Sequence, residues 1–463
     1  KYFGANYKNT VWIGNGTNTD PATASIPTTA SFNRVDVDRH QFFHHFDSID
    51  NPSTLSSRIT FNPKITTVGA SVVYKHQWDN YFFKVNIPFS KVKNNLGVSV
   101  SETKDTDWDK GILDYLNGTM DYSSTNSKQS PLLYLKVDGN SHDKSTVGDV
   151  VLSLGYKFAE KEDFNCVASA NLIIPGGNKP TSEFLFEPIV GNGGHAGLGF
   201  DFDITLNLQR TKETCLELMT SFNWRYLFED TEKRTLGFHH DILKYEDVFY
   251  PAATGETIAC SYELRHVTMP WNHYLLGGQS GVAGVFPLAN VLTQDVDVAP
   301  EASFNGSIGI AYHREKTVLD VGYSCYARSA EKVTLKNSWS NDTYAPAEDS
   351  YNVSDAFALI TAYETGLEHD DYADPTVYYF NYGTSGENGT VMSNGLAINR
   401  ENLDVDAAST PAVFTHTIHM GASMMLDNFD YPAMAGVGFS YEWGNDNAAP
   451  TAWNCWAKFG LSF

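Results

Sequence analysis

The final segment of the chain, Trp453–Phe463, has the sequence WNCWAKFGLSF. Apolar residues (Trp, Cys, Ala, Phe, Leu and Phe) occupy every second position, and Asn, Trp, Lys, Gly and Ser stand between them. Successive side chains of a strand point to opposite faces, so an apolar period of two indicates a strand with one apolar face. The chain is therefore predicted to end on a β-strand whose last residue is aromatic.

The same alternation recurs in ten further segments: 65–76, 80–90, 147–158, 163–174, 198–208, 214–228, 302–313, 317–328, 417–424 and 433–443. Aromatic residues make up 13% of the chain and there are 36 glycines, a composition that favours strands and tight turns over helices. No apolar run approaches the roughly 18 residues that a spanning helix needs. The fold class is predicted to be all-β.

The connections between these segments separate a soluble sandwich from a membrane barrel, because alternation alone is common to both. Short charged turns join pairs of strands at 75–80, 159–163, 209–213, 314–317 and 427–431. Between the pairs run long connections at about 91–146, 175–196, 229–301 and 329–414, with a shorter one at 444–452. Alternating short and long connections are typical of transmembrane barrels, which have tight periplasmic turns and long outer loops.

We therefore predict a transmembrane antiparallel up-and-down β-barrel of about 12 strands, with 14 to 16 as the wider range. An upward first strand is expected within 32–62, in SFNRVDVDRHQFF or LSSRITFNP, and 256–269 could add a hairpin. Residues 1–31 are predicted to form an amino-terminal arm or a plug, and 32–463 a single barrel with long outer loops.

The sequence resembles the outer-membrane porins and related channel barrels of Gram-negative bacteria. The residues that carry this resemblance are the terminal strand and its last residue, Phe463, which looks like the recognition signal of the barrel-assembly machinery. The resemblance implies an integral outer-membrane protein that contacts membrane lipid and lipopolysaccharide, is inserted by that machinery and assembles as a trimer.

A narrower resemblance covers residues 147–208, where GDVVLSLGYKF, ANLIIPGGNKP and GLGFDFDITLNL are similar to hydrophobic-compound transporters of the fatty-acid-channel type. This resemblance implies an amino-terminal hatch and a side opening for apolar substrates. Residues 1–54 contain no hatch motif.

If the apolar side chains face lipid, the opposite phase of the strands lines the lumen. Six acids and six bases have that phase, and in a pore such groups either set ion selectivity or pair into a lattice that stiffens the wall. The predicted pore-lining residues are Lys75, Lys84, Asp149, Lys157, Asp201, Asp203, Glu217, Arg225, Asp320, Arg328, Glu442 and Lys458.

The formal charge of −23 makes nucleic acid an improbable partner, because affinity for phosphates requires Lys and Arg. Residues 331–410 hold 14 Asp and Glu against 3 Lys and Arg, so this segment alone contributes −11. Such a segment is typical of a solvated loop, and at an outer mouth it would attract cations.

Metal binding is a weaker hypothesis. A weak calcium site is one interpretation of the acidic cluster Glu364, Glu368, Asp370, Asp371 and Asp374, although adventitious divalent binding at a solvated face is favoured over a dedicated site. The histidines His40, His44, His45, His239 and His240 lack a recognisable zinc spacing, as do the cysteines Cys166, Cys215, Cys260, Cys325 and Cys455. An odd number of cysteines leaves at least one thiol unpaired or bonded to another chain.

Three functions remain open. The first is a porin for passive diffusion of small hydrophilic solutes, with a preference for cations over anions. The second is a structural or adhesive surface barrel with a closed lumen, and the third is a channel for hydrophobic compounds. The sequence shows no catalytic frame and no cofactor motif, because GGQSG at 277–281 lacks the spacing of a nucleophile elbow and the glycines at 191–197 precede a strand rather than a helix.

Overall fold

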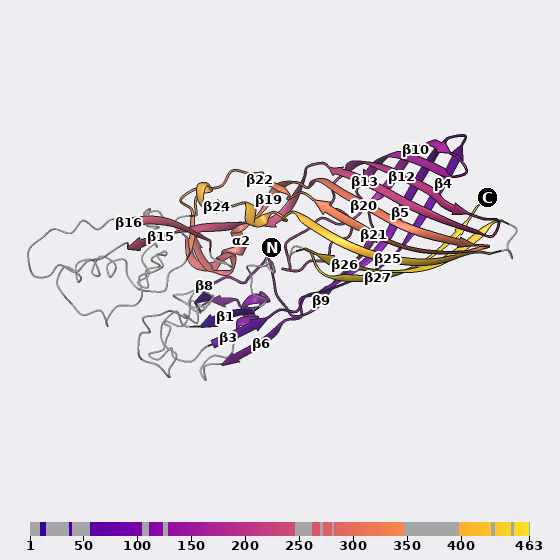
Figure 1. The fold of residues 1–463 in the computed structure, drawn as a ribbon. Helices are drawn as coiled ribbons and strands as arrows, with labels where there is room; N and C mark the ends of the chain where they lie inside the picture. Colours follow the sequence, from indigo (N-terminus) through magenta and orange to yellow (C-terminus); the bar gives the residue numbers. More distant parts are fainter. Residues whose placement is uncertain are drawn as a thin grey trace, which may run out of the picture.

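The computed structural model describes residues 10–14, 37–38, 56–103, 111–123, 128–245, 262–268, 272–279, 282–346, 398–426, 431–445 and 449–462. The chain is mostly β-structure and forms one large curled sheet with several small sheets at one end (Figure 1). None of the described helices is long and apolar enough to cross a membrane.

The large sheet has twelve strands in the order β27-β26-β25-β21-β20-β13-β12-β11-β10-β5-β4, with β9 also paired to β5. The strands are β4 (Lys64–Trp78), β5 (Tyr81–Asn95), β9 (Ser141–Val147), β10 (Val150–Glu160), β11 (Phe164–Ile174), β12 (Gly197–Arg210), β13 (Thr214–Leu227), β20 (Glu301–Arg314), β21 (Thr317–Arg328), β25 (Val413–Leu426), β26 (Ala433–Gly444) and β27 (Ala452–Leu461). We call this sheet the wall.

The prediction of an antiparallel sheet of about twelve strands is confirmed, and all eleven alternating segments are wall strands. The extra strand was placed wrongly, because Val37–Asp38 (β2) and Ser56–Thr60 (β3) belong to a separate small sheet. The twelfth strand is instead β9, which pairs with the outer half of β5 after a break at Gly148 and Asp149. The 256–269 segment does not extend the wall either, since β16 (Tyr262–Thr268) pairs with β15 (Gly237–Tyr245).

The two faces of the wall differ in polarity. Residues that face one another on adjacent strands share a face, and one such row runs Ile310, Val321, Met420 and Phe439, all of them exposed. An apolar surface of this extent is rare on a soluble monomer, whereas lipid covers it in a membrane barrel. The other face carries Ser, Thr, Asn, Gly and charged residues such as Asp203, Glu217 and Arg225, whereas Lys91 and Lys93 near the outer end of β5 have the phase of the apolar face.

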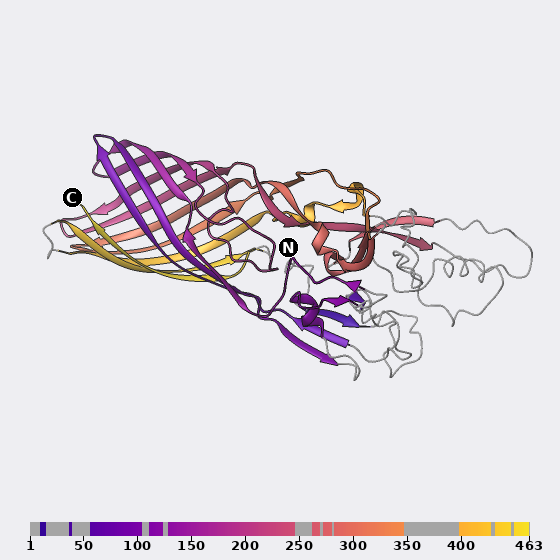
Figure 2. The same cartoon turned by 180° about the vertical axis from the view of Figure 1, so that it is seen from behind.

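The wall is curled but its ends do not pair with each other. Every step along the strand order is antiparallel, so β4 and β27, which are separated by ten steps, run in the same direction. In the described structure each of them pairs on one side only, with β5 and β26 respectively. Figure 2 shows the two edge strands from behind, with the short turns at the end of the sheet where β27 finishes.

The long connections fold into small sheets at the opposite end of the wall (Figure 1). The strands of these sheets are β1 (Thr10–Gly14), β2, β3 and β6 (Ser99–Thr103); β14 (Asp230–Thr235), β19 (Thr293–Ala299) and β22 (Lys332–Leu335); β15, β16 and β24 (Leu403–Asp404); and β7 (Tyr122–Ser123), β8 (Lys128–Gln129), β17 (Leu276–Gln279), β18 (Val282–Pro287) and β23 (Tyr344–Pro346). The short helices are α1 (Ile112–Leu116), α2 (Ala289–Leu292), η3 (Asn272–Tyr274), η5 (Arg400–Asn402) and η6 (Asp406–Ala408).

These outer sheets share a hydrophobic core, which we call the outer core. It joins residues from several long connections, among them Leu132, Leu236, Leu288 and Ile398. Two buried tyrosines link its parts, since Tyr115 Oη donates to the carbonyl of Tyr274 at 2.5 Å and Tyr274 Oη donates to the carbonyl of Leu135 at 2.6 Å. The outer connections therefore form a packed unit with buried side chains rather than separate loops.

The outer core can be tested with two adjacent leucines. Leu132 is 1% exposed and Leu133 is 51% exposed, so Leu132→Ala should lower the free energy of unfolding of the outer unit by about 2–5 kcal/mol and Leu133→Ala by less than about 0.5 kcal/mol. Hydrogen exchange of the outer segments in the folded protein measures the difference. Equal effects of the two substitutions would contradict a packed outer core.

The assignment of the two wall faces can be tested in the same way with neighbouring residues of β20. Ile308 is on the apolar face and 50% exposed, whereas Ser307 is on the polar face. Ile308→Arg should destabilise the membrane-inserted protein by about 2–4 kcal/mol if it lies near the bilayer centre, and Ser307→Arg should have little effect. Reversible urea unfolding in liposomes gives both values, and a larger cost for Ser307→Arg would reverse the assignment.

Candidate functional site: a chamber at the outer end of the wall

Eleven of the twelve predicted pore-lining residues lie on the polar face of the wall strands, opposite the exposed apolar side chains. Asp149 lies in the break between β9 and β10, where its Oδ1 accepts a hydrogen bond from the backbone N–H of Gly176 at 3.2 Å. The eleven are Lys75, Lys84, Lys157, Asp201, Asp203, Glu217, Arg225, Asp320, Arg328, Glu442 and Lys458. Their role in a pore remains a prediction.

The register places four cations of the polar face in one row, which we call the cationic row. Lys75 and Lys84 lie near the short turn between β4 and β5, whereas Arg225 and Arg328 lie towards the outer ends of β13 and β21. Each member faces the next across one strand spacing, and the row contains four cations and no acid. From β4 to β25 its members are Lys75, Lys84, Ser153, Asn171, Gly199, Arg225, Ser303, Arg328 and Val413.

The acids of the wall lie in rows nearer the short turns. Asp203 shares a row with Glu442, and Glu217 shares the next acidic row with Asp320. Several of these carboxylates are already engaged: Asp201 accepts hydrogen bonds from Asn223 and from Ser169, and Glu217 Oε2 lies 2.9 Å from Nε2 of His313. From β12 to β21 the acids thus lie nearer the short turns than the arginines, while Lys157 shares the row of Asp203 and Lys458 also lies near the short turns.

A chamber of about 680 Å³ lies where the wall meets the outer sheets. Its wall side includes Arg225, Ser303 and Arg328 of the cationic row. The connection from β11 to β12 contributes an apolar stretch to the same lining, with Phe184, Leu185, Phe186 and Ile189. The chamber therefore brings a basic wall and an apolar surface together around one space.

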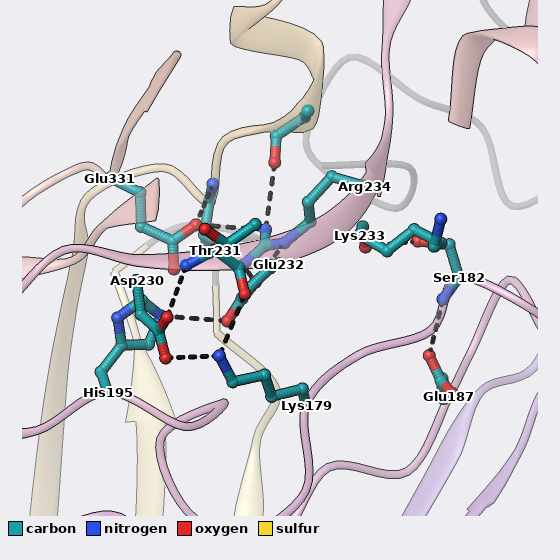
Figure 3. Close-up of polar contacts among 12 residues, drawn as sticks. Lys179, Ser182, Glu187, His195, Asp230, Thr231, Glu232, Lys233, Arg234 and Glu331 are labelled. Carbon is teal, nitrogen blue, oxygen red and sulfur yellow. Dashed lines mark hydrogen bonds and ion pairs between the residues drawn. The ribbon is translucent and has the colours of Figure 1, made fainter. Parts of the chain in front are cut away.

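A buried network of charges fastens this connection to the outer sheets (Figure 3). His195 is 1% exposed; its Nε2 lies 3.0 Å from Glu232 Oε1 and its Nδ1 lies 2.8 Å from the carbonyl oxygen of Phe228. A carbonyl and a carboxylate only accept, so both ring nitrogens must donate and His195 must be protonated to satisfy both. Burial acts to lower the pKa of His195, but the hydrogen bonds to Glu232 and Phe228 outweigh it and the pKa is raised.

Arg234 extends the network to more distant parts of the chain. Its Nε donates to Glu232 Oε2 at 2.6 Å, and its Nη1 donates to Glu331 Oε2 at 3.2 Å and to the carbonyl of Ala408 at 3.0 Å. Lys179 adds a second link, since its Nζ lies 2.5 Å from Asp230 Oδ2 (Figure 3). β14 is therefore tied to two other long connections at the top of the chamber, 175–196 and 329–414.

Glycine is required at one point of this network. Gly193 has a φ of +72°, and a Cβ placed there would lie 2.3 Å from Glu232 Oε1. A side chain at this position would meet both backbone strain and the buried carboxylate that holds His195. The glycine-rich stretch 191–197 is explained by this close approach.

The remaining sequence predictions are only partly covered by the structure. Cys166, Cys215, Cys325 and Cys455 are free thiols, and Cys260 lies outside the described residues. Phe463, the calcium candidates Glu364, Glu368, Asp370, Asp371 and Asp374, and the histidines His40, His44 and His45 also lie outside them, while the side chains of His239 and His240 are not described. Among the described residues there is no group of three His, Cys, Asp or Glu that could hold a metal ion.

A curled antiparallel sheet with one apolar face, a polar inner face, short turns at one end and folded connections at the other is the architecture of an integral outer-membrane β-barrel. No family model matches the chain, and no curated protein matches it. Among solved structures, a match is the crystal structure of an outer membrane channel from Pseudomonas putida F1. It covers 89% of this chain and 85% of that chain with 9% sequence identity and a TM-score of 0.33, so the class is assigned from the strand geometry.

The histidine network makes the top of the chamber sensitive to pH. Because the pKa of His195 is raised above its ordinary value of about 6.5, its stabilising contribution is fully present below that value and is lost as the pH rises through the folded-state pKa. Hydrogen exchange at residues 190–197, corrected for intrinsic rates, should therefore increase between pH 6 and pH 9. His195→Gln should remove this pH dependence; an unchanged dependence in that variant would assign it to another group.

Proposed function

We propose that this chain is an outer-membrane channel for small organic compounds that have an apolar part, which is the hydrophobic-compound alternative among the functions predicted from the sequence. The observation that carries the proposal is the chamber, where an apolar surface and a polar and basic wall line one space. Its volume of about 680 Å³ lies within the range of pockets that enclose small molecules.

The polar face of the wall supports a water-filled path below the chamber. One row on that face runs Ser221, Ser307, Ser324 and Thr417, whose small hydroxyl side chains offer hydrogen bonds to passing water. A wholly apolar compound gains nothing from such a surface. The solutes that suit both surfaces are compounds with an apolar body and a polar or charged end.

The edges of the wall support a side exit for the apolar part. In the described structure β4 pairs only with β5, and β27 pairs only with β26. Apolar side chains stand exposed on both edge strands, among them Val72 of β4 and Trp453 of β27. An opening between these strands would connect the lumen to the hydrocarbon core of the membrane.

Diffusion of small hydrophilic solutes is the second candidate, favoured by the polar face of the wall. The two candidates differ in how the channel treats an apolar body. Acetate and benzoate carry the same carboxylate and differ mainly in the aromatic ring, so they form a matched pair of probes.

The test is planar-bilayer recording of the purified full chain in potassium chloride, with benzoate or acetate added to one side. We expect stable conductance steps that benzoate reduces in a concentration-dependent manner, while acetate at the same concentration has little effect. Equal effects of the two anions would favour the hydrophilic porin. An absence of conductance at all voltages would contradict both channel functions and favour the closed surface barrel.

A further inference from the structure

We infer that Arg225, Ser303 and Arg328 form a binding site in the chamber for the anionic head group of an organic acid whose apolar body contacts residues 184–189. This inference rests on the proposed function and names its substrate class. The three residues lie on neighbouring strands, with Ser303 facing Arg225 on one side and Arg328 on the other. Two strand spacings put the Cα atoms of the arginines about 10 Å apart, so their side chains can approach one head group from two sides.

Arg225 and Arg328 have N–H donors that are available to bind an anion. Within the described residues neither Arg225 nor Arg328 forms an ion pair, and Nε of Arg328 is shielded from solvent without a hydrogen-bond acceptor. A guanidinium has five N–H donors and no acceptor, and an inaccessible donor without a partner costs free energy. A carboxylate matches these donors because guanidinium and carboxylate can form two parallel hydrogen bonds.

The acids that line the chamber do not neutralise these arginines. Glu232 and Glu331 are bound by Arg234, and Glu301 is paired with Lys332. Glu187 accepts hydrogen bonds from the backbone N–H groups of Thr181 and Ser182 and from the Thr181 hydroxyl. None of these four carboxylates pairs with Arg225 or Arg328, although Glu187 has no cationic partner among the described residues and keeps its negative charge.

No acid lies in the row of the two arginines. Lys75 and Lys84 lie in this row with the two arginines, and no carboxylate occurs in it. The acids of the wall are displaced towards the short turns, where Asp203, Glu217, Asp320 and Glu442 occur. From β12 to β21, an anion on the polar face is therefore attracted by the arginines and repelled by the acids nearer the short turns.

The apolar side of the chamber distinguishes an organic acid from an inorganic anion. Phe184, Leu185, Phe186 and Ile189 line the same chamber as the arginines, and aromatic rings there can stack on a flat apolar body. A carboxylate attached to one ring or to a short chain would satisfy both surfaces at once. Chloride or phosphate would contact the arginines alone.

The experiment measures equilibrium binding of benzoate to the purified full chain in detergent at neutral pH, by calorimetry or saturation-transfer NMR. Arg225→Gln and Arg328→Gln should each weaken benzoate binding about tenfold, the effect of losing one hydrogen-bonded charge. Arg225→Lys keeps the charge without the paired donors and should weaken binding by a smaller factor. Lys458→Gln removes a cation from the same face near the short turns and should leave binding unchanged.

Benzyl alcohol has the same ring without the charge. It therefore distinguishes a failure of the anion site from a failure of the function proposed for the chamber. If benzoate binds at least tenfold more tightly than benzyl alcohol and the difference disappears in Arg225→Gln/Arg328→Gln, the anion site is supported. If both probes bind alike and the arginine variants bind benzoate as the parent does, the anion site is wrong while the chamber keeps its proposed function. If neither probe binds, the anion site and the function proposed for the chamber are both wrong.

Discussion

The structure depends on the requirement that every backbone N–H and C=O in hydrocarbon must be paired within the protein. Antiparallel pairing satisfies the backbone groups of the strands from β5 to β26, each of which has a neighbour on both sides, and within the described residues it leaves one edge each of β4 and β27 without a partner strand. Pairing along the strands also fixes the direction of every side chain, so apolar residues gather on one face and polar residues on the other. The lipid-facing surface and the charged inner face follow from the same hydrogen-bond ladder.

The same ladder determines which charges meet. Arg225 and Arg328 are about a hundred positions apart in the chain, yet both face Ser303 because β13, β20 and β21 are neighbours. The outer side of the chamber is assembled differently. It consists of long connections that are held together by the outer core and by the network of His195, Glu232 and Arg234. The wall and the long connections together form the chamber, because residues from both line it.

Much of the wall could be predicted from the sequence. The alternation of single residues identified all eleven long segments and the phase of eleven of the twelve charged residues singled out, because period-two alternation is a local property. The strand sought within 32–62 was misplaced for the opposite reason: SSRIT alternates like a wall strand, but its partners are β1 and β6, and pairing partners are a tertiary property.

The chamber could not be predicted, because it depends on register and on contacts between distant segments. The twelve charged residues appeared as an even mixture of signs, and only the paired positions show that Lys75, Lys84, Arg225 and Arg328 share one row. His195 and Glu232 gave no signal, since a lone histidine and a single acid 37 positions apart have no recognisable spacing. The glycine-rich stretch 191–197 was the one local indication that the chain makes a close approach there.

The central claim is that the wall crosses a membrane with its apolar face in lipid and its polar face in water. The most direct measurement places a nitroxide spin label at each position from 304 to 312 of β20 in turn and compares collisions with oxygen and with a water-soluble nickel complex in liposomes. We expect even-numbered positions to favour oxygen and odd-numbered positions to favour nickel. The same preference at all positions, or the reverse alternation, would contradict the account.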